Sequence, residues 1–106
     1  MTGQPEPAST QLIFAALSDP TRREMLVLLG EKASSASRLS EPLGISRQAA
    51  ARHLGILLDA GLARRRRDGR EIVFELVPGG WGPATDYIGG LQAGVGGMSA
   101  KASESG

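Results

Sequence analysis

The sequence contains no cysteine, and this absence excludes several kinds of site at once. A disulfide framework, a thiol redox switch, a catalytic thiol and a thiolate-bound metal all need a residue that is not there. Aromatic residues make up only 4% of the 106 residues, and a single domain of this size has a modest apolar core. We therefore expect the fold to benefit from burying further surface against a second copy.

Long hydrophobic runs and catalytic motifs are also missing. No apolar stretch approaches the roughly 20 residues of a membrane helix, and the polar, proline-bearing N-terminus is unlike a signal peptide. The chain has one histidine and lacks a phosphate-binding loop, a nucleophile elbow and a paired-carboxylate motif. We expect a cytoplasmic protein that is not an enzyme, has no cofactor and does not act at a membrane.

Arginine is what the sequence does have, and it is concentrated in one region. The net charge is only +1, yet residues 38–70 carry eight arginines against three acidic residues. Four of these arginines are consecutive, from Arg64 to Arg67. A local positive excess of this kind is typical of a surface that contacts nucleic acid.

Apolar spacing and capping residues predict that most of the chain is helical. Asp19 and Ser46 carry side chains that cap helix N-termini, and Pro20 suits the first position of a helix. The apolar residues then recur with helical spacing. Four helices are expected in this part, over residues 11–17, residues 19–30, a brief segment that ends at Gly44, and residues 47–60.

A β-hairpin is expected next, because Asp68-Gly69 is a strong signal for a two-residue turn. The strands are expected over residues 62–67 and 70–77. Side chains alternate along a strand, so Arg64 and Arg66 face one way while Arg65 and Arg67 face the other. Some of the arginines are expected to pair with glutamates of the second strand rather than to contact one common ligand.

The C-terminal part predicts a weak helix from residue 84 onward. Its apolar residues keep helical spacing, but its many glycines favour a short or frayed helix. Trp81, in the link before it, is interpreted as a packing anchor. The predicted organisation is a disordered segment over 1–9, one domain over 10–96 and a flexible tail over 97–106. The predicted fold is mostly α with a small β-hairpin, in the order α-α-α-α-β-β-α.

This order is that of a winged helix-turn-helix, and five motifs occur along it: Ala16-Leu17-Ser18-Asp19-Pro20-Thr21-Arg22-Arg23, Leu39-Ser40-Glu41-Pro42-Leu43-Gly44-Ile45-Ser46, His53-Leu54 with Leu57, Asp59-Ala60-Gly61-Leu62 and Arg67-Asp68-Gly69-Arg70. In these motifs the sequence resembles the ArsR/SmtB-type (arsenic-repressor) family of bacterial transcriptional regulators. The resemblance covers about residues 10–95 and implies a homodimer, joined through its first and last helices, that binds a two-fold symmetric operator and usually represses.

The resemblance also bears on metal sensing. In many members two cysteines at the start of the third helix bind a metal that releases the DNA, and the equivalent positions here are Ser35 and Ser37. Serine hydroxyls are poor ligands for such metals. Other members use Asp, Glu and His of the last helix, which here offers only Asp86. We therefore expect no metal at either position, and the chain looks closer to the metal-independent branch, with no effector identified.

The helix predicted to begin at Arg47 is the candidate for reading DNA bases. Gln48 can recognise adenine, and Arg47 or Arg52 can recognise guanine, through bidentate hydrogen bonds; the plainer alternative is a solvated helix face. For His53 a structural hydrogen bond and a phosphate contact both stay open, and Gly55 stands where the family often has a basic residue. The candidate DNA-binding residues are Ser46, Arg47, Gln48, Ala51, Arg52, His53, Arg65, Arg66, Arg67 and Arg70.

Apolar residues of the first and last helices are the candidates for dimerisation, although they also fit a simple core. They are Leu12, Ile13, Phe14, Leu17, Tyr87, Ile88 and Leu91. The predicted function is a sequence-specific, double-stranded DNA-binding regulator. The alternative is a winged helix that binds another protein without reading an operator, and the concentration of positive charge argues against it.

Overall fold

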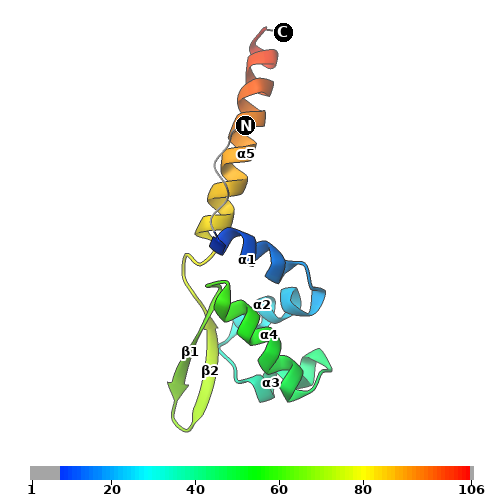
Figure 1. Ribbon diagram of the computed structural model, residues 1–106, viewed down its shortest axis with the longest axis vertical. Coiled ribbons are helices and arrows are strands. Elements are labelled where there is room, and N and C mark those ends of the chain that lie inside the picture. Colours follow the sequence, from blue (N-terminus) through cyan, green and yellow to red (C-terminus); the bar gives the residue numbers. More distant parts are fainter. Residues whose placement is uncertain (1–7, 106) are drawn as a thin grey trace.

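The computed structural model describes the backbone of residues 8–105 and the side chains of residues 9–94; residues 1–7, most of the segment predicted to be disordered, lie outside it. Within this range the chain forms helices and one antiparallel hairpin (Figure 1), which confirms the predicted order. The elements are α1 (Ala8–Leu17), α2 (Pro20–Glu31), α3 (Ala36–Leu43), α4 (Arg47–Asp59), β1 (Ala63–Asp68), β2 (Glu71–Leu76) and α5 (Gly82–Ser105). None of the described helices is both long and apolar enough to cross a membrane.

The corner between α1 and α2 is built on Asp19. Its carboxylate accepts hydrogen bonds from the backbone N–H groups of Thr21 (2.7 Å) and Arg22 (3.2 Å), so it caps α2 as predicted. Burial raises the pKa of Asp19, but these N–H donors together with the nearby charge of Arg22 hold the pKa below its usual 3.8. The helix was predicted to end at Gly30; it continues through Gly30 to Glu31, because the N–H of Lys32 still bonds to the carbonyl of Leu28.

Arg22 joins three helices through one side chain that is only 12% exposed. Its guanidinium donates to the carbonyl oxygens of Ala16 (2.9 Å) and Ala15 (3.1 Å) at the end of α1, and the carbonyl of Ala15 also accepts from the backbone N–H and hydroxyl of Ser18. A third nitrogen lies 3.2 Å from Nδ1 of His53 on α4. Arg22 therefore holds α4 in place relative to the corner between α1 and α2.

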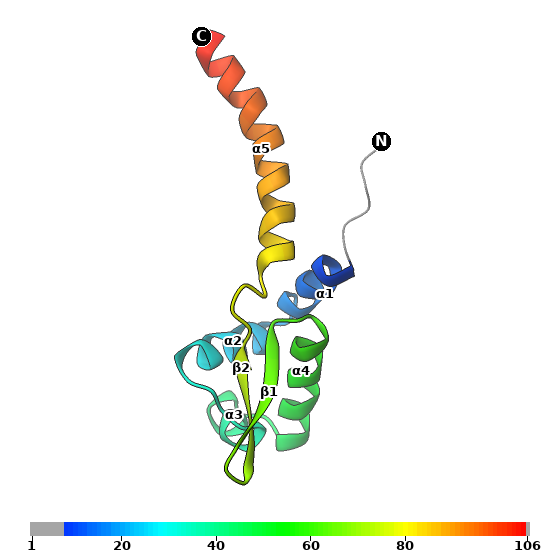
Figure 2. The ribbon, with the colours of Figure 1, turned by 90° about the vertical axis from the view of Figure 1, so that its left-hand side faces the viewer.

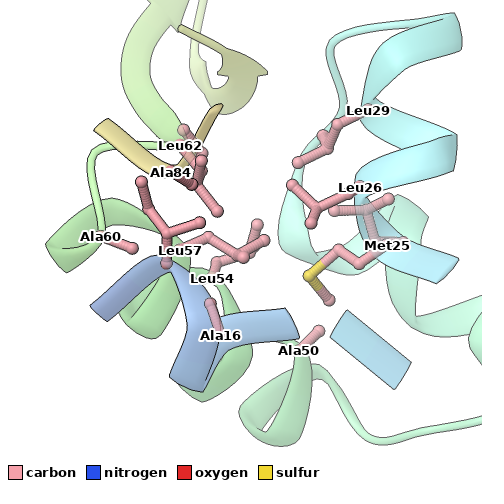
Figure 3. Packing of buried hydrophobic residues seen from close by; sticks show 13 residues of the cluster. Ala16, Met25, Leu26, Leu29, Ala50, Leu54, Leu57, Ala60, Leu62 and Ala84 are labelled. Atoms are coloured by element: carbon pink, nitrogen blue, oxygen red, sulfur yellow. The ribbon is translucent and has the colours of Figure 1, made fainter. Parts of the chain in front are cut away.

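The core lies between α1, α2 and α4 and extends to the start of the hairpin (Figure 3). Ala50, Leu54 and Leu57 of α4 recur with helical spacing and are fully buried, while Leu58 lies at the edge of the cluster. Trp81 packs against the same cluster, which confirms its predicted role as an anchor for α5. The outward face of α4 is consequently left to polar residues.

α3 and α4 form the helix-turn-helix. Ser35 caps α3, and Gly44 ends it with φ +66°, a left-handed conformation that glycine adopts without strain. Ser46 then caps α4 by accepting the N–H of Ala49 at 3.0 Å. Pro42 lies inside the last turn of α3, where it has no backbone N–H to donate to the helix.

The hairpin, called the wing below, pairs β1 with β2 in antiparallel register from Ala63↔Leu76 to Asp68↔Glu71. The residues of its turn are therefore Gly69 and Arg70, one position later than the predicted Asp68-Gly69. Gly69 has φ +66°, and no non-glycine residue among residues 8–105 has a positive φ, which is the pattern of a type II′ turn with glycine first. The shift places Arg70 in the turn itself.

α5 is longer than predicted. It runs from Gly82 to Ser105 and projects beyond the other helices (Figure 1), whereas the sequence predicted a frayed helix and a flexible tail from residue 97. The residues after the glycines include methionine, alanine, lysine and glutamate, which favour helix and offset part of the glycine cost. Its first turns lie against α1, where Phe14 and Tyr87 meet edge to face with ring centroids 5.9 Å apart.

Candidate nucleic-acid interface

The start of α4 and the turn of the wing lie at the same end of the molecule. Both ribbon views place them at the end opposite to α1 and the C-terminus (Figures 1 and 2). Arg47, Gln48, Ala51 and Arg52 are all exposed on α4, as predicted for a helix face that meets a partner. Ser46 is exposed too, although its hydroxyl is engaged as the helix cap.

His53 is oriented differently from its neighbours. It is half-buried, and its Nδ1 accepts the hydrogen bond from Arg22, since a guanidinium can only donate. The proton of the neutral ring is therefore on Nε2. The sequence left a structural hydrogen bond and a phosphate contact open for His53, and the structure contains the structural hydrogen bond, to Arg22.

The face of the wing that carries Arg64 and Arg66 is occupied by Glu75. Each arginine donates through Nε to a separate oxygen of this carboxylate at 2.8 Å, as the predicted alternation and cross-strand pairing suggested. The hydrogen bonds from Arg66 and Arg64 hold the pKa of Glu75 below its usual 4.5. Val73 is buried on the same face of β2. The side chains of Arg64 and Arg66 stay 56% and 47% exposed, but both are engaged by Glu75.

The opposite face of the wing carries free positive charge. Arg65, Arg67 and the turn residue Arg70 are exposed, and among the described side chains they have no carboxylate partner. Arg65 and Arg70 line a hollow of about 410 Å³, which we call the wing hollow. Its lining residues are Ser35, Ala36, Ser37, Arg47, Arg65, Arg70, Glu71, Ile72 and Phe74. The structure thus brings residues of the predicted α4 and wing sets together.

Two structural features of this region do not follow from any pattern in the sequence. The first is the role of Arg22, because nothing in the sequence shows that this arginine packs against two carbonyls and a histidine. The second is the wing hollow. Ser35 and Ser37 stand where relatives have metal-binding cysteines, but the sequence does not indicate that they line a hollow with three arginines. Within the described residues, no three His, Cys, Asp or Glu side chains cluster closely enough to hold a metal ion.

The residues predicted for dimerisation divide into three groups by their exposure. Leu12, Tyr87, Ile88 and Leu91 are among the large hydrophobic residues that the fold leaves exposed, and they lie on α1 and α5. Phe14 and Leu17 are half-buried against the core. Ile13 is fully buried in that core, so it is unavailable to a second chain.

Comparison with known proteins identifies the relatives of this chain. Residues 17–66 match a helix-turn-helix domain family. The chain is 38% identical over 72 residues to a probable mercury resistance operon repressor of Streptomyces lividans, covering 66% of this chain and 56% of that protein. It is 38% identical over 64 residues to the transcriptional repressor SdpR of Bacillus subtilis, covering 60% and 71% respectively. The chain therefore spans little more than half the length of the first of these relatives.

A solved structure extends the likeness over almost the whole chain. An ArsR-like transcriptional regulator from Rhodococcus sp. RHA1 superimposes with a TM-score of 0.79 at 35% sequence identity, covering 92% of each chain. Together with the exposed start of α4 and the wing beside it, this defines a winged helix-turn-helix protein of the DNA-binding, transcription-regulating class. The chain belongs to the ArsR family.

Proposed function

We propose that the protein is a homodimeric repressor that works in the cytoplasm and binds a palindromic operator through α4 and the wing. The observation that carries this proposal is the division of the molecule into two ends. One end presents exposed basic and amide side chains on a helix-turn-helix, and the other leaves apolar residues of α1 and α5 uncovered. Two of its relatives are named as repressors, which supports the same direction of regulation.

The proposed division of labour follows from the chemistry of the side chains. Gln48 and Arg52, on the exposed face of α4, read bases in the major groove, and Ala51 lets the helix approach closely enough to do so. Arg67 and Arg70 contact the phosphate backbone beside the groove. Such phosphate contacts set affinity and register, whereas the α4 contacts set sequence preference.

One in-vitro selection from random DNA duplexes tests the proposal. The expected result is a palindrome with two half-sites, bound with an affinity that falls steeply with salt because bound arginines release counterions. Recovery of no preferred duplex, together with a stable protein partner in a pull-down, would contradict it and favour an interaction module.

Two substitutions separate the proposed roles on the selected duplex. Gln48→Ala should change the preferred base at one position of each half-site, at a cost of about 1–3 kcal/mol for that position. Arg67→Ala should weaken binding to all sequences alike and make the salt dependence shallower. If Arg67→Ala changed base preference and Gln48→Ala did not, the assignment of α4 as the reading helix would be wrong.

A further inference from the structure

The wing hollow joins three elements that are separate in sequence. One wall is the start of α3, the second is Arg47 at the start of α4, and the third is the wing with Arg65 and Arg70. Its volume of about 410 Å³ lies within the roughly 300–1,000 Å³ range of sites that hold small molecules. The hollow therefore has room for a group the size of a nucleotide.

Two walls of the hollow are fixed to each other by backbone hydrogen bonds. The N–H of Ser34 donates to the carbonyl of Phe74 (3.0 Å), and the N–H of Phe74 donates to the carbonyl of Ser34 (2.8 Å). Ser35, which is buried, then caps α3 by accepting the N–H of Arg38. The start of α3 is thus held against β2, and a ligand would meet a site that is already formed.

The charge of the hollow is positive. Arg47, Arg65 and Arg70 are exposed, and no carboxylate among the described side chains lies within ion-pair distance of them. The one acidic residue in the lining, Glu71, has Arg38 at 3.6 Å, which offsets its charge. The first N–H groups of α3 add to this positive potential. Three arginines that line one space suit an anion with several acceptor oxygens.

The remaining lining is apolar. Ile72 and Phe74 form part of it, and Ile72 is among the large hydrophobic residues that stay exposed. A bare inorganic anion would leave these side chains in water, whereas the carbon face of a sugar would cover them. The combination of guanidiniums and an apolar wall therefore suits a phosphate attached to a sugar.

We propose that the wing hollow binds a sugar phosphate ester, and that in the operator complex it holds one backbone phosphate with its deoxyribose. The DNA form of this inference rests on the proposed function. It reassigns Arg47 from base reading to phosphate binding, so that base reading falls to Gln48 and Arg52. A free nucleotide has the same chemistry, would occupy the same place and would then compete with DNA.

The DNA source is tested by replacing single backbone phosphates of the selected operator with neutral methylphosphonates. Wild-type protein should lose about tenfold in affinity at one phosphate position of each half-site. Arg65→Gln should lose about the same on unmodified DNA and nothing further when that phosphate is neutralised. The matched control is Arg64→Gln, which removes the same charge from the opposite face of β1, and it should keep the full effect of the methylphosphonate.

The free-ester source is tested without DNA. Thymidine 5′-monophosphate is titrated into the full chain while the amide resonances of Ala36, Ser37 and Arg38 are followed by NMR. Saturable shifts in wild type and Arg64→Gln that are absent in Arg65→Gln would support a nucleotide as ligand. Competition of the nucleotide with operator DNA would then extend the same conclusion to regulation.

The outcomes separate this inference from the proposed function. A position-specific methylphosphonate effect that Arg65→Gln abolishes, saturable amide shifts that Arg65→Gln abolishes, or both support the hollow as a sugar phosphate site and identify its source. If neither arises, and Arg65→Gln behaves like Arg64→Gln in both assays, the inference is overturned even when the operator is bound. If wild-type protein binds no DNA, the proposed function fails, and the nucleotide titration alone decides whether the hollow is a site.

Discussion

Arg22 shows how much a single side chain can contribute in a small domain. It is nearly buried, and it satisfies two carbonyls of α1 and one nitrogen of His53. We expect Arg22→Met to lower the free energy of unfolding by about 2–4 kcal/mol, because the part-buried carbonyl of Ala16 and Nδ1 of His53 lose their donor. The matched control is Arg23→Met, because the exposed side chain of Arg23 donates, among the described residues, to the carbonyl of Leu17 alone; this variant should lose less than about 1 kcal/mol. Urea unfolding measures both, and equal losses would contradict this role.

A substitution at Gly55 is expected to raise the free energy of unfolding, whereas the substitution at Arg22 lowers it. A Cβ added there meets nothing within 4 Å, and the residue lies inside α4 with an ordinary helical backbone. Gly55→Ala should raise the free energy of unfolding by about 0.5–1 kcal/mol. Gly80→Ala is the contrasting variant, because its Cβ would lie 2.6 Å from the carbonyl oxygen of Gly61, and we expect a loss of about 1–3 kcal/mol. Thermal unfolding that moves both variants in one direction would be inconsistent with this packing.

At the residue scale the sequence predicted what depends on local chemistry. Asp19, Ser46 and Gly44 have the roles that their side chains and positions predicted, because capping and left-handed turns involve only neighbouring residues. The contact between His53 and Arg22 joins positions 31 residues apart, and no local rule brings them together. The wing hollow was hidden for the same reason.

At the scale of elements, one carboxylate makes the two faces of the wing differ in the number of unpaired arginines. Glu75 holds Arg64 and Arg66, which leaves Arg65, Arg67 and Arg70 as the arginines available to a ligand. We expect Glu75→Gln to free two further cations, which tightens binding to any duplex and makes the salt dependence steeper by up to about 2 in the slope of log K against log salt.

Glu24→Gln is the control for this wing prediction. It makes the same charge change on α2, at a carboxylate with no arginine partner among the described side chains. The slope for this variant should stay that of the wild type. A slope that changed equally in the two variants would mean that net charge, rather than release of the two arginines, controls binding.

The same ion pairs make the wing sensitive to acid. Hydrogen bonds from Arg66 and then Arg64 lower the pKa of Glu75 below 4.5, so the carboxylate stabilises the folded wing above that pH. This contribution is lost as pH falls through the lowered pKa. Carboxyl NMR titration should give a pKa below 4.5 in wild type and a higher one in Arg66→Gln. An unchanged pKa in Arg66→Gln would show that the hydrogen bond does not hold in solution.

The limits of sequence reasoning at this scale lie at the ends of elements. A two-residue turn was predicted correctly, but Asp68-Gly69 and Gly69-Arg70 both place glycine in it, and only the pairing of whole strands chooses between them. The final helix was predicted to be short because each of its glycines weakens a helix. Its observed length of 24 residues reflects the helix-favouring residues that follow them.

At the scale of the whole molecule, the arrangement of α1 and α5 determines where a second copy could join. These helices lie at the end away from the wing (Figure 2), so a second copy joined there would leave both basic ends free for DNA. The first turns of α5 cover part of α1, yet Ile88 and Leu91 stay 51% and 55% exposed. A monomer would present these apolar side chains to water, whereas a dimer would bury them.

This arrangement predicts that one charge on α5 separates the two copies. Ile88→Asp should give a monomer by light scattering at micromolar concentration, because each interface would bury an unpaired carboxylate. Its affinity for the full palindrome should fall to that of a single half-site. Val27→Asp is the matched control, since Val27 on α2 is 63% exposed and outside the α1–α5 surface, and it should stay dimeric. A dimeric Ile88→Asp, or a monomeric wild type that binds the palindrome fully, would place the contact between copies elsewhere.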